Sequence, residues 1–154
     1  MTAATRLLVV SAALLVLPAV THAHFRLMEP ASWIVENDLG DPQKAGPCGG
    51  TNTDYGKPTY AVTQAVGGRT LHIKVIETIY HPGHYRVALA VNSPLETDVT
   101  LPNISCKKCT LQVVQFMEQH GPNNPGNYTY HHCANIQITA DPKKPIDAAW
   151  PKER

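Results

Sequence analysis

The sequence lacks an excess of charge of either sign. Its 154 residues include 13 Lys and Arg against 12 Asp and Glu, and Arg6 is the only charged residue among the first 23. A balanced chain offers neither the basic surface that binds nucleic acid nor one that attracts an anionic membrane. We therefore expect no nucleic-acid partner.

Several patterns are also missing. The chain has no internal repeat, no glycine-rich nucleotide motif and no H-E-x-x-H pair, so neither nucleotide binding nor a zinc hydrolase is indicated. No segment keeps a helical period. The apolar run from Leu7 to Val20 is interrupted by Ser11 and Pro18 and is shorter than the roughly 20 residues of a membrane-spanning helix. These absences favour an all-β chain with no stable membrane anchor.

Residues 1–23 are typical of a secretory signal peptide. Arg6 supplies the positive charge, the apolar run follows, and Thr21 and Ala23 are the small residues expected before a cleavage site. Cleavage after Ala23 makes His24 the first residue of a secreted or periplasmic protein. Cleavage after Thr21 would instead begin the protein at His22, but Ala is the more usual residue before the cut.

All four cysteines lie beyond the predicted signal peptide. Export to an oxidising compartment favours two disulfides. Cys106 and Cys109 have the C-x-x-C spacing of redox and zinc sites, but no second C-x-x-C and no alternation of strands and helices accompanies them. Three pairings are possible among Cys48, Cys106, Cys109 and Cys133, and the sequence does not choose between them.

Residues 24–59 are rich in proline and glycine, which predicts a long irregular region that a disulfide of Cys48 connects to the rest of the chain. Beyond it, short runs of Val, Ile, Thr and Leu alternate with Gly, Pro and Asn. We expect an immunoglobulin-like antiparallel β-sandwich over residues 24–140, cross-linked by disulfides, and a poorly ordered tail over residues 141–154. The predicted strands cover residues 60–66, 69–78, 84–91, 97–101, 110–118 and 134–140.

Histidines provide the candidate chemistry. A histidine at a chain terminus offers a metal two nitrogens, the α-amine and ring Nδ1, and one further imidazole completes the tetragonal set of nitrogens that Cu(II) prefers. His24 is such a terminus after cleavage. His81 and His84 flank a tight Pro82-Gly83 turn between predicted strands, where binding residues are commonly carried. The sequence therefore predicts a site for one copper ion.

Five short motifs, spread along the mature chain between residues 24 and 136, resemble those of the lytic polysaccharide monooxygenases and the related chitin-binding type-4 domains. Residues 24–33 (H-F-R-L-M-E-P-A-S-W) are similar to the mature start of that family, and residues 47–50 (P-C-G-G) to its cysteine loop. Residues 81–85 (H-P-G-H-Y) resemble the segment that carries its second copper histidine. Residues 106–112 (C-K-K-C-T-L-Q) and 130–136 (Y-H-H-C-A-N-I) resemble two of its strands.

The resemblance implies that His24 and His81 bind copper, with His81 preferred to His84 as the second imidazole. Tyr130 falls at the position of the family's axial aromatic, and His132, on the same strand face, is a candidate neighbouring donor. The implied activity is the oxidative cleavage of chitin or cellulose. That reaction requires copper, an external electron donor and O₂ or peroxide.

The sequence departs from the family beside Tyr130. Insect-type members have a Gln-Glu pair where this chain has Asn127 and Tyr128, so a candidate proton donor is missing. His84, which is not usually a histidine in the family, could take that catalytic role or add a copper ligand. The aromatic side chains available to stack on sugar rings are Trp33, Tyr55 and Tyr60.

We expect a copper-dependent polysaccharide monooxygenase. The competing hypothesis is a non-catalytic protein that scavenges, delivers or buffers copper outside the cytoplasm, which is consistent with the small size, the extra histidines and the missing glutamate. A purely adhesive β-sandwich with incidental histidines is a third hypothesis.

Overall fold

The computed structural model describes residues 24–87, 96–118, 122 and 125–150. The predicted signal peptide, residues 1–23, lies outside the described residues, as do residues 88–91 of the strand predicted over residues 84–91. The described residues form seven strands. None of them belongs to a helix that is long and apolar enough to cross a membrane.

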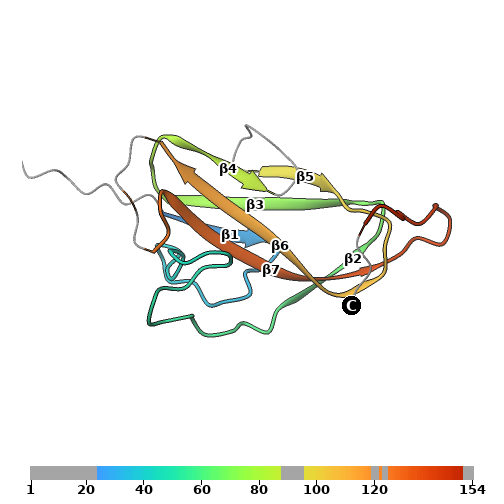
Figure 1. Cartoon of the computed structure of the whole chain (residues 1–154), viewed down its shortest axis with the longest axis horizontal. Helices are drawn as coiled ribbons and strands as arrows, with labels where there is room; N and C mark the ends of the chain where they lie inside the picture. Colours follow the sequence, from blue (N-terminus) through green and yellow to red (C-terminus); the bar gives the residue numbers. More distant parts are fainter. Residues whose placement is uncertain (1–23, 88–95, 119–121, 123–124, 151–154) are drawn as a thin grey trace, which may run out of the picture.

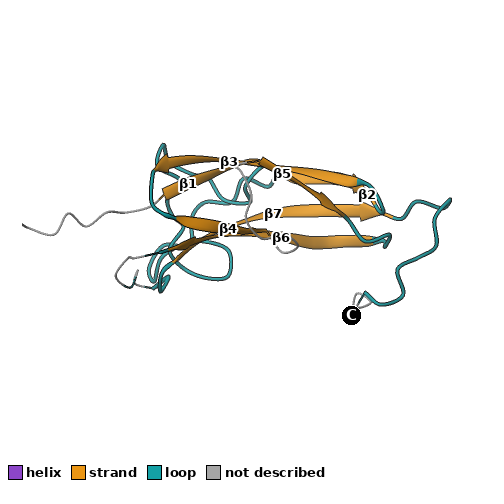
Figure 2. Cartoon of the chain, turned by 90° about the horizontal axis from the view of Figure 1, so that it is seen from above, coloured by secondary structure: helices purple, strands orange, loops and turns teal. Residues whose placement is uncertain are grey.

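Two β-sheets lie face to face and enclose the core (Figures 1 and 2). The smaller sheet has the strand order β1-β3-β5 and the larger has the order β2-β7-β6-β4. The expected all-β fold is therefore confirmed. The strands are β1 (His24–Glu29), β2 (Val62–Val66), β3 (Thr70–Ile79), β4 (Gly83–Val87), β5 (Glu96–Thr100), β6 (Cys106–Met117) and β7 (Thr129–Thr139).

Two sequence-based expectations were wrong. The backbone is not irregular from residue 24, because Phe25 and Leu27 are two residues apart, both enter the core, and their strand pairs with β3. The sheets are also not purely antiparallel, since β2 pairs with β7 in parallel. The segment of residues 30–61 is long enough to return the chain to that edge in the same direction, which a short hairpin is not.

The interior is apolar along most of its length but polar at one end. Every second side chain of β3 and β6 faces the core, including Ile73 and Val75 in β3. The next core-facing positions towards the end of β3 and of β6 are Glu77 and Gln115. This end also receives the start of β1 and of β7 (Figure 1).

Two disulfides form, as the cysteine count predicts. Cys48 pairs with Cys133 and joins the segment of residues 30–61 to β7, whereas Cys106 pairs with Cys109 inside a bulge at the start of β6. Trp33 N donates to Cys133 O at 2.9 Å beside the first disulfide. That disulfide therefore fixes the long N-terminal segment against the larger sheet.

Residues 141–150 are attached to Asn103, which is buried. Its side-chain Nδ2 donates to the carbonyl oxygens of Asp141, Lys144 and Pro145 at 3.0–3.1 Å, and its Oδ1 accepts from Asp141 N at 2.7 Å. The part of the expected tail that the structure describes thus has a buried polar attachment.

We expect the two disulfides to contribute unequally to stability. In the chain-entropy description, a disulfide restrains the unfolded chain more when it closes a longer loop. The paired cysteines are 85 residues apart in Cys48–Cys133 and 3 residues apart in Cys106–Cys109. Replacing Cys48 and Cys133 together by Ser should lower the free energy of unfolding by about 4 to 5 kcal/mol, and the matching change at Cys106 and Cys109 by about 2 kcal/mol. Urea unfolding of the two double variants measures the difference, and equal losses would contradict the expectation.

Candidate metal centre

His24, His81 and Tyr130 lie at the polar end of the sandwich, although they come from distant parts of the sequence. His24 opens β1 and is the antiparallel partner of Ile79, and His81 follows Ile79 by two residues. Such Cα partners are about 5 Å apart, so both histidines lie at the same end of the smaller sheet. The ring centroids of Tyr130 and His24 are 5.1 Å apart, with the ring planes tilted by 30°.

The His24 ring is oriented by Asp41. His24 is 5 % exposed, and its Nε2 lies 3.3 Å from Asp41 Oδ2. The hydrogen bond from His24 lowers the pKa of Asp41, which is therefore an ionised acceptor at neutral pH. Because a carboxylate only accepts, the ring proton lies on Nε2 and Nδ1 carries the lone pair. Nδ1 is the ring nitrogen that a terminal histidine presents to a metal together with its α-amine.

The His81 ring is oriented by its own turn. Its Nδ1 lies 2.8 Å from the carbonyl oxygen of Pro82, and its backbone N donates to Glu77 Oε1 at 3.4 Å. A carbonyl oxygen is only an acceptor, so Nδ1 carries the proton and Nε2 carries the lone pair. Histidine ligands of metals are commonly fixed in this way by a carbonyl on the other ring nitrogen.

Two core-facing polar side chains, of which Gln115 is buried, connect the histidines through the interior. Glu77 Oε1, which accepts from His81 N, also accepts from Gln115 Nε2 at 3.1 Å. Gln115 is the cross-strand partner of Tyr130, whose ring contacts His24. Glu77 and Gln115 were not predicted from the sequence. The sequence does contain a sign of them, because both are polar residues at positions where the alternation of their strands otherwise places apolar side chains in the core.

The Tyr130 hydroxyl is buried and neutral. Tyr130 is fully buried, and this burial raises the pKa of its hydroxyl to about 12. Within the described residues, neither this hydroxyl nor Gln115 Oε1 has a hydrogen-bond partner. Buried polar atoms are nearly always hydrogen-bonded in folded proteins, so this end of the core suits a water or ligand atom.

The possible ligands at this end suit copper better than they suit a metal that prefers carboxylate ligands. Over residues 24–87, 96–118, 122 and 125–150, no group of three or more His, Cys, Asp or Glu side chains is arranged to hold a metal. A site made from two imidazoles and an α-amine needs only two such side chains. The nitrogen donors would be the α-amine and Nδ1 of His24 and Nε2 of His81, a set that suits Cu(II).

His84 lies apart from this cluster. It follows the alternation of β4 opposite to Tyr85, which packs on the core, so the His84 side chain is on the outer face of the larger sheet. Its ring stacks on Phe116 at 5.2 Å, and its Nδ1 is 3.8 Å from Glu118 Oε1. The structure thus brings together three of the four predicted site residues and places the fourth outside the core.

The outer edge of β1 is closed by side chains instead of another strand. Phe25 N donates to Gln43 Oε1 at 3.2 Å, and Leu27 N donates to Glu36 Oε1 at 3.1 Å. His132 Nε2 lies 3.1 Å from Phe25 O and donates to it. The sequence analysis did not identify Gln43 or Glu36, because neither belongs to a motif. Together these three side chains fix the strand that begins with His24.

Gln43 is held through both its side chain and its backbone. It is fully buried, its Nε2 donates to Leu39 O at 3.3 Å, and its backbone oxygen accepts from His131 N at 2.7 Å. Gly40 lies nearby with φ at +98°, and a Cβ there would collide with the carbonyl oxygen of Phe25. Only glycine therefore permits this close approach of the loop to β1.

The three candidate sugar-stacking aromatics line one groove. Trp33, Tyr55 and Tyr60 surround a space of about 300 Å³ beside Asn135. Asn135 is on the outer face of β7, since Ala134 and Ile136 face the core. Tyr55 and Tyr60 are both highly exposed, so their rings are accessible to a ligand. The groove therefore borders the outer face of the larger sheet, whereas His24 contacts Tyr130 on the core side of that sheet.

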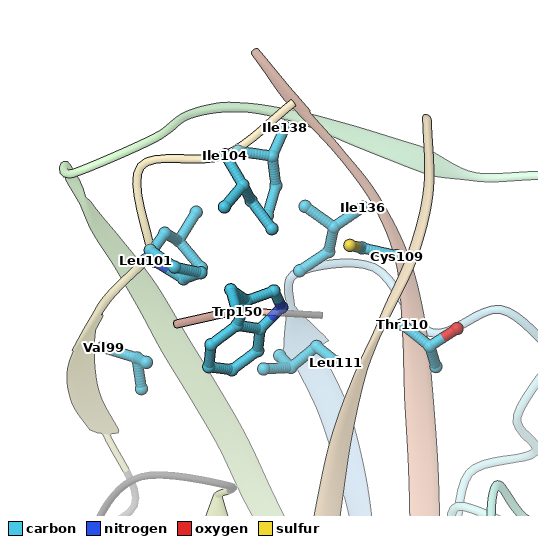
Figure 3. Close-up of a pocket in the computed structure, with 10 residues that line it drawn as sticks. Val99, Leu101, Ile104, Cys109, Thr110, Leu111, Ile136, Ile138 and Trp150 are labelled. Atoms are coloured by element: carbon cyan, nitrogen blue, oxygen red, sulfur yellow. The ribbon is translucent and has the colours of Figure 1, made fainter. Parts of the chain in front are cut away.

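A second cavity of about 110 Å³ lies at the other end of the sandwich (Figure 3). Its lining includes Leu101, Ile104, Ile136 and Ile138, and the indole of Trp150 lies among these side chains. A lining of this kind offers no ligand for a metal.

No protein-family model matches this chain, and neither the curated proteins nor the solved structures contain a match. The resemblance to the polysaccharide monooxygenases therefore depends on the short motifs alone.

We expect Gln43→Leu to destabilise the protein by about 1 to 3 kcal/mol, because it leaves the buried Phe25 N–H without an acceptor. Gln64→Leu is the matched control. Gln64 is exposed and its side chain donates to the half-buried Gln137, so the loss on substitution should stay within about 0.5 kcal/mol. Urea unfolding compares the two variants, and similar losses would mean that Gln43 does not hold β1.

Proposed function

We propose that this protein is secreted or periplasmic, begins at His24 after cleavage, and binds one copper ion through the α-amine and Nδ1 of His24 and Nε2 of His81. The observation that carries this proposal is the orientation of the two rings. Asp41 directs the His24 proton to Nε2, and Pro82 O directs the His81 proton to Nδ1. Both rings therefore present the nitrogen that a histidine brace requires.

The chemistry proposed for the site is oxidative cleavage of a polysaccharide such as chitin or cellulose. Copper, when bound, supplies one-electron redox chemistry with O₂ or peroxide once an external donor has reduced it. Tyr130 packs a neutral aromatic ring beside His24 and adds no charged ligand, which leaves the three nitrogens as the strong donors. Asp41 and Glu77 hold the two histidine segments in place.

The groove formed by Trp33, Tyr55 and Tyr60 supports a polysaccharide partner, because aromatic faces can stack on sugar rings and the Asn135 amide can hydrogen-bond to hydroxyls. We also propose that the two sheets form an immunoglobulin-like sandwich. The parallel pairing of β2 with β7 is then a local variation at one edge.

The second candidate function is non-catalytic copper binding for scavenging, delivery or buffering. Two observations favour it. Asn127 and Tyr128, at the end of the loop before β7, provide no carboxylic acid beside Tyr130. The aromatic groove also lies on the side of the larger sheet, so a bound glycan would have to extend around the edge to reach His24.

His81→Ala should weaken Cu(II) binding by roughly 100-fold or more, since it removes one of three nitrogens and even the loss of a ligand's hydrogen-bond partner typically costs 10- to 100-fold. His84→Ala should leave the affinity unchanged, because His84 stacks on Phe116 outside the core. A form that retains Ala23 should also bind weakly, because its His24 has no α-amine. Competition titration and electron paramagnetic resonance of the Cu(II) form measure these effects. A loss confined to His84→Ala would refute the assignment of His81.

Enzyme and carrier differ in their products. With copper, ascorbate and O₂ or peroxide, the enzyme should release oxidised oligosaccharides from chitin or cellulose, and Tyr60→Ala should reduce that release without changing copper affinity. Mass spectrometry of the soluble products makes the comparison. Copper binding with no oxidised product from either polysaccharide would favour the carrier.

A further inference from the structure

A buried acid and a buried histidine meet behind β1. The Glu36 side chain is 6 % exposed and that of His132 is 0 % exposed, and Glu36 Oε1 lies 3.2 Å from His132 Nδ1. Each also holds the backbone of β1, since Glu36 Oε1 accepts from Leu27 N and His132 Nε2 donates to Phe25 O. The pair therefore connects two backbone groups of the strand that carries His24.

No hydrogen bond to His132 Nδ1 forms among the described residues, and Glu36 Oε1, 3.2 Å away, can supply a donor only if the pair holds a proton. Phe25 O is an acceptor, so the ring proton of neutral His132 lies on Nε2 and its Nδ1 carries a lone pair. An ionised Glu36 would turn a negative oxygen towards that lone pair. A protonated Glu36 instead donates to Nδ1 and completes a chain from Glu36 through His132 to Phe25.

We propose that Glu36 and His132 form a proton-holding clamp that positions β1, and with it His24, and that the clamp is complete only while Glu36 carries the proton it donates to His132. Glu36 and His132 are positioning residues, because neither is among the proposed copper ligands. The part of the inference that concerns copper rests on the proposed function. The part that concerns the strand does not.

The electrostatic surroundings place the proton on Glu36 at mildly acidic pH. Burial raises the pKa of Glu36 to about 7, although hydrogen bonds from Leu27 and Ser32 and the charge of Arg26, whose Nε is 3.7 Å from Oε2, favour the carboxylate. Burial lowers the pKa of His132 to about 4. Among the other groups that act on His132, the charge of Asp41 raises its pKa and His131 lowers it.

Loss of the Glu36 proton should rearrange the clamp. The His132 proton then moves by exchange with solvent from Nε2 to Nδ1, where it can be donated to the carboxylate, and Phe25 O loses its donor. The ring stays neutral, and one proton leaves the pair. The outer edge of β1 is consequently held by fewer hydrogen bonds above pH 7 than at pH 5.5.

Histidine ring ¹⁵N spectra of the wild-type apoprotein test the clamp without any variant. We expect His132 to carry its proton on Nε2 at pH 5.5 and on Nδ1 at pH 8.5. Glu36→Gln should keep one tautomer at both values, since an amide has no titratable proton. An unchanged wild-type tautomer would overturn the proposal.

Unfolding equilibria test the same clamp through its proton. The pKa of Glu36 is raised above its ordinary value of 4.5, so its stabilisation is complete below about pH 4.5 and is lost as the pH rises to about 7. The unfolding constant of the wild type relative to Glu36→Gln should therefore rise about tenfold per pH unit in that window. Glu29→Gln, an exposed change on the same strand, is the matched control and should show no such trend. A flat ratio for Glu36→Gln would also overturn the proposal.

Copper titration tests whether the clamp acts on His24. The Cu(II) affinity of the wild type relative to Glu36→Gln should fall between pH 5.5 and pH 8.5, because only the wild type loses the Glu36 proton over that range. A constant ratio, together with the expected tautomer change, would show that β1 moves without displacing His24 and would overturn that half of the inference. Failure of every form to bind copper would instead refute the proposed function, and the ¹⁵N and unfolding results would still decide the clamp.

Discussion

The structure depends on how the backbone N–H and C=O groups on the outer edge of β1 find hydrogen-bond partners. β1 is an edge strand, and an edge strand exposes unpaired N–H and C=O groups that must be satisfied when they are buried. Here Gln43, Glu36 and His132 supply the partners from a loop and from the opposite sheet. Because these contacts are made by buried side chains with few alternative positions, they also fix the backbone next to His24.

The long segment of residues 30–61 can perform this task because it is anchored at both the backbone and the side-chain level. The Cys48–Cys133 disulfide joins it to β7, and Gly40 allows its backbone to approach Phe25. Asp41 comes from the same segment and orients the His24 ring. A region that contains no strand therefore controls the geometry of the candidate metal centre.

Much of the fold could be predicted from local patterns. The strand positions, the two disulfides and the all-β class follow from the alternation of apolar residues, the cysteine count and the turn residues. β1 was missed because Pro30 and the glycines that follow suggested irregular backbone from the first residue. The parallel pairing of β2 with β7 could not be predicted, since it depends on where a long connection returns the chain.

The sequence by itself determined which residues are candidates for copper binding: a histidine directly after a predicted cleavage site, a second histidine in a tight turn, and a tyrosine three residues before a cysteine. Only the tertiary structure decided that His24, His81 and Tyr130 occupy one end of the sandwich and that His84 does not. It also decided which ring nitrogens carry protons, through Asp41 and Pro82 O, and it paired Glu36 with His132. The physical reason is that hydrogen-bond partners and burial are set by residues distant in the sequence, whereas a motif records only its neighbours.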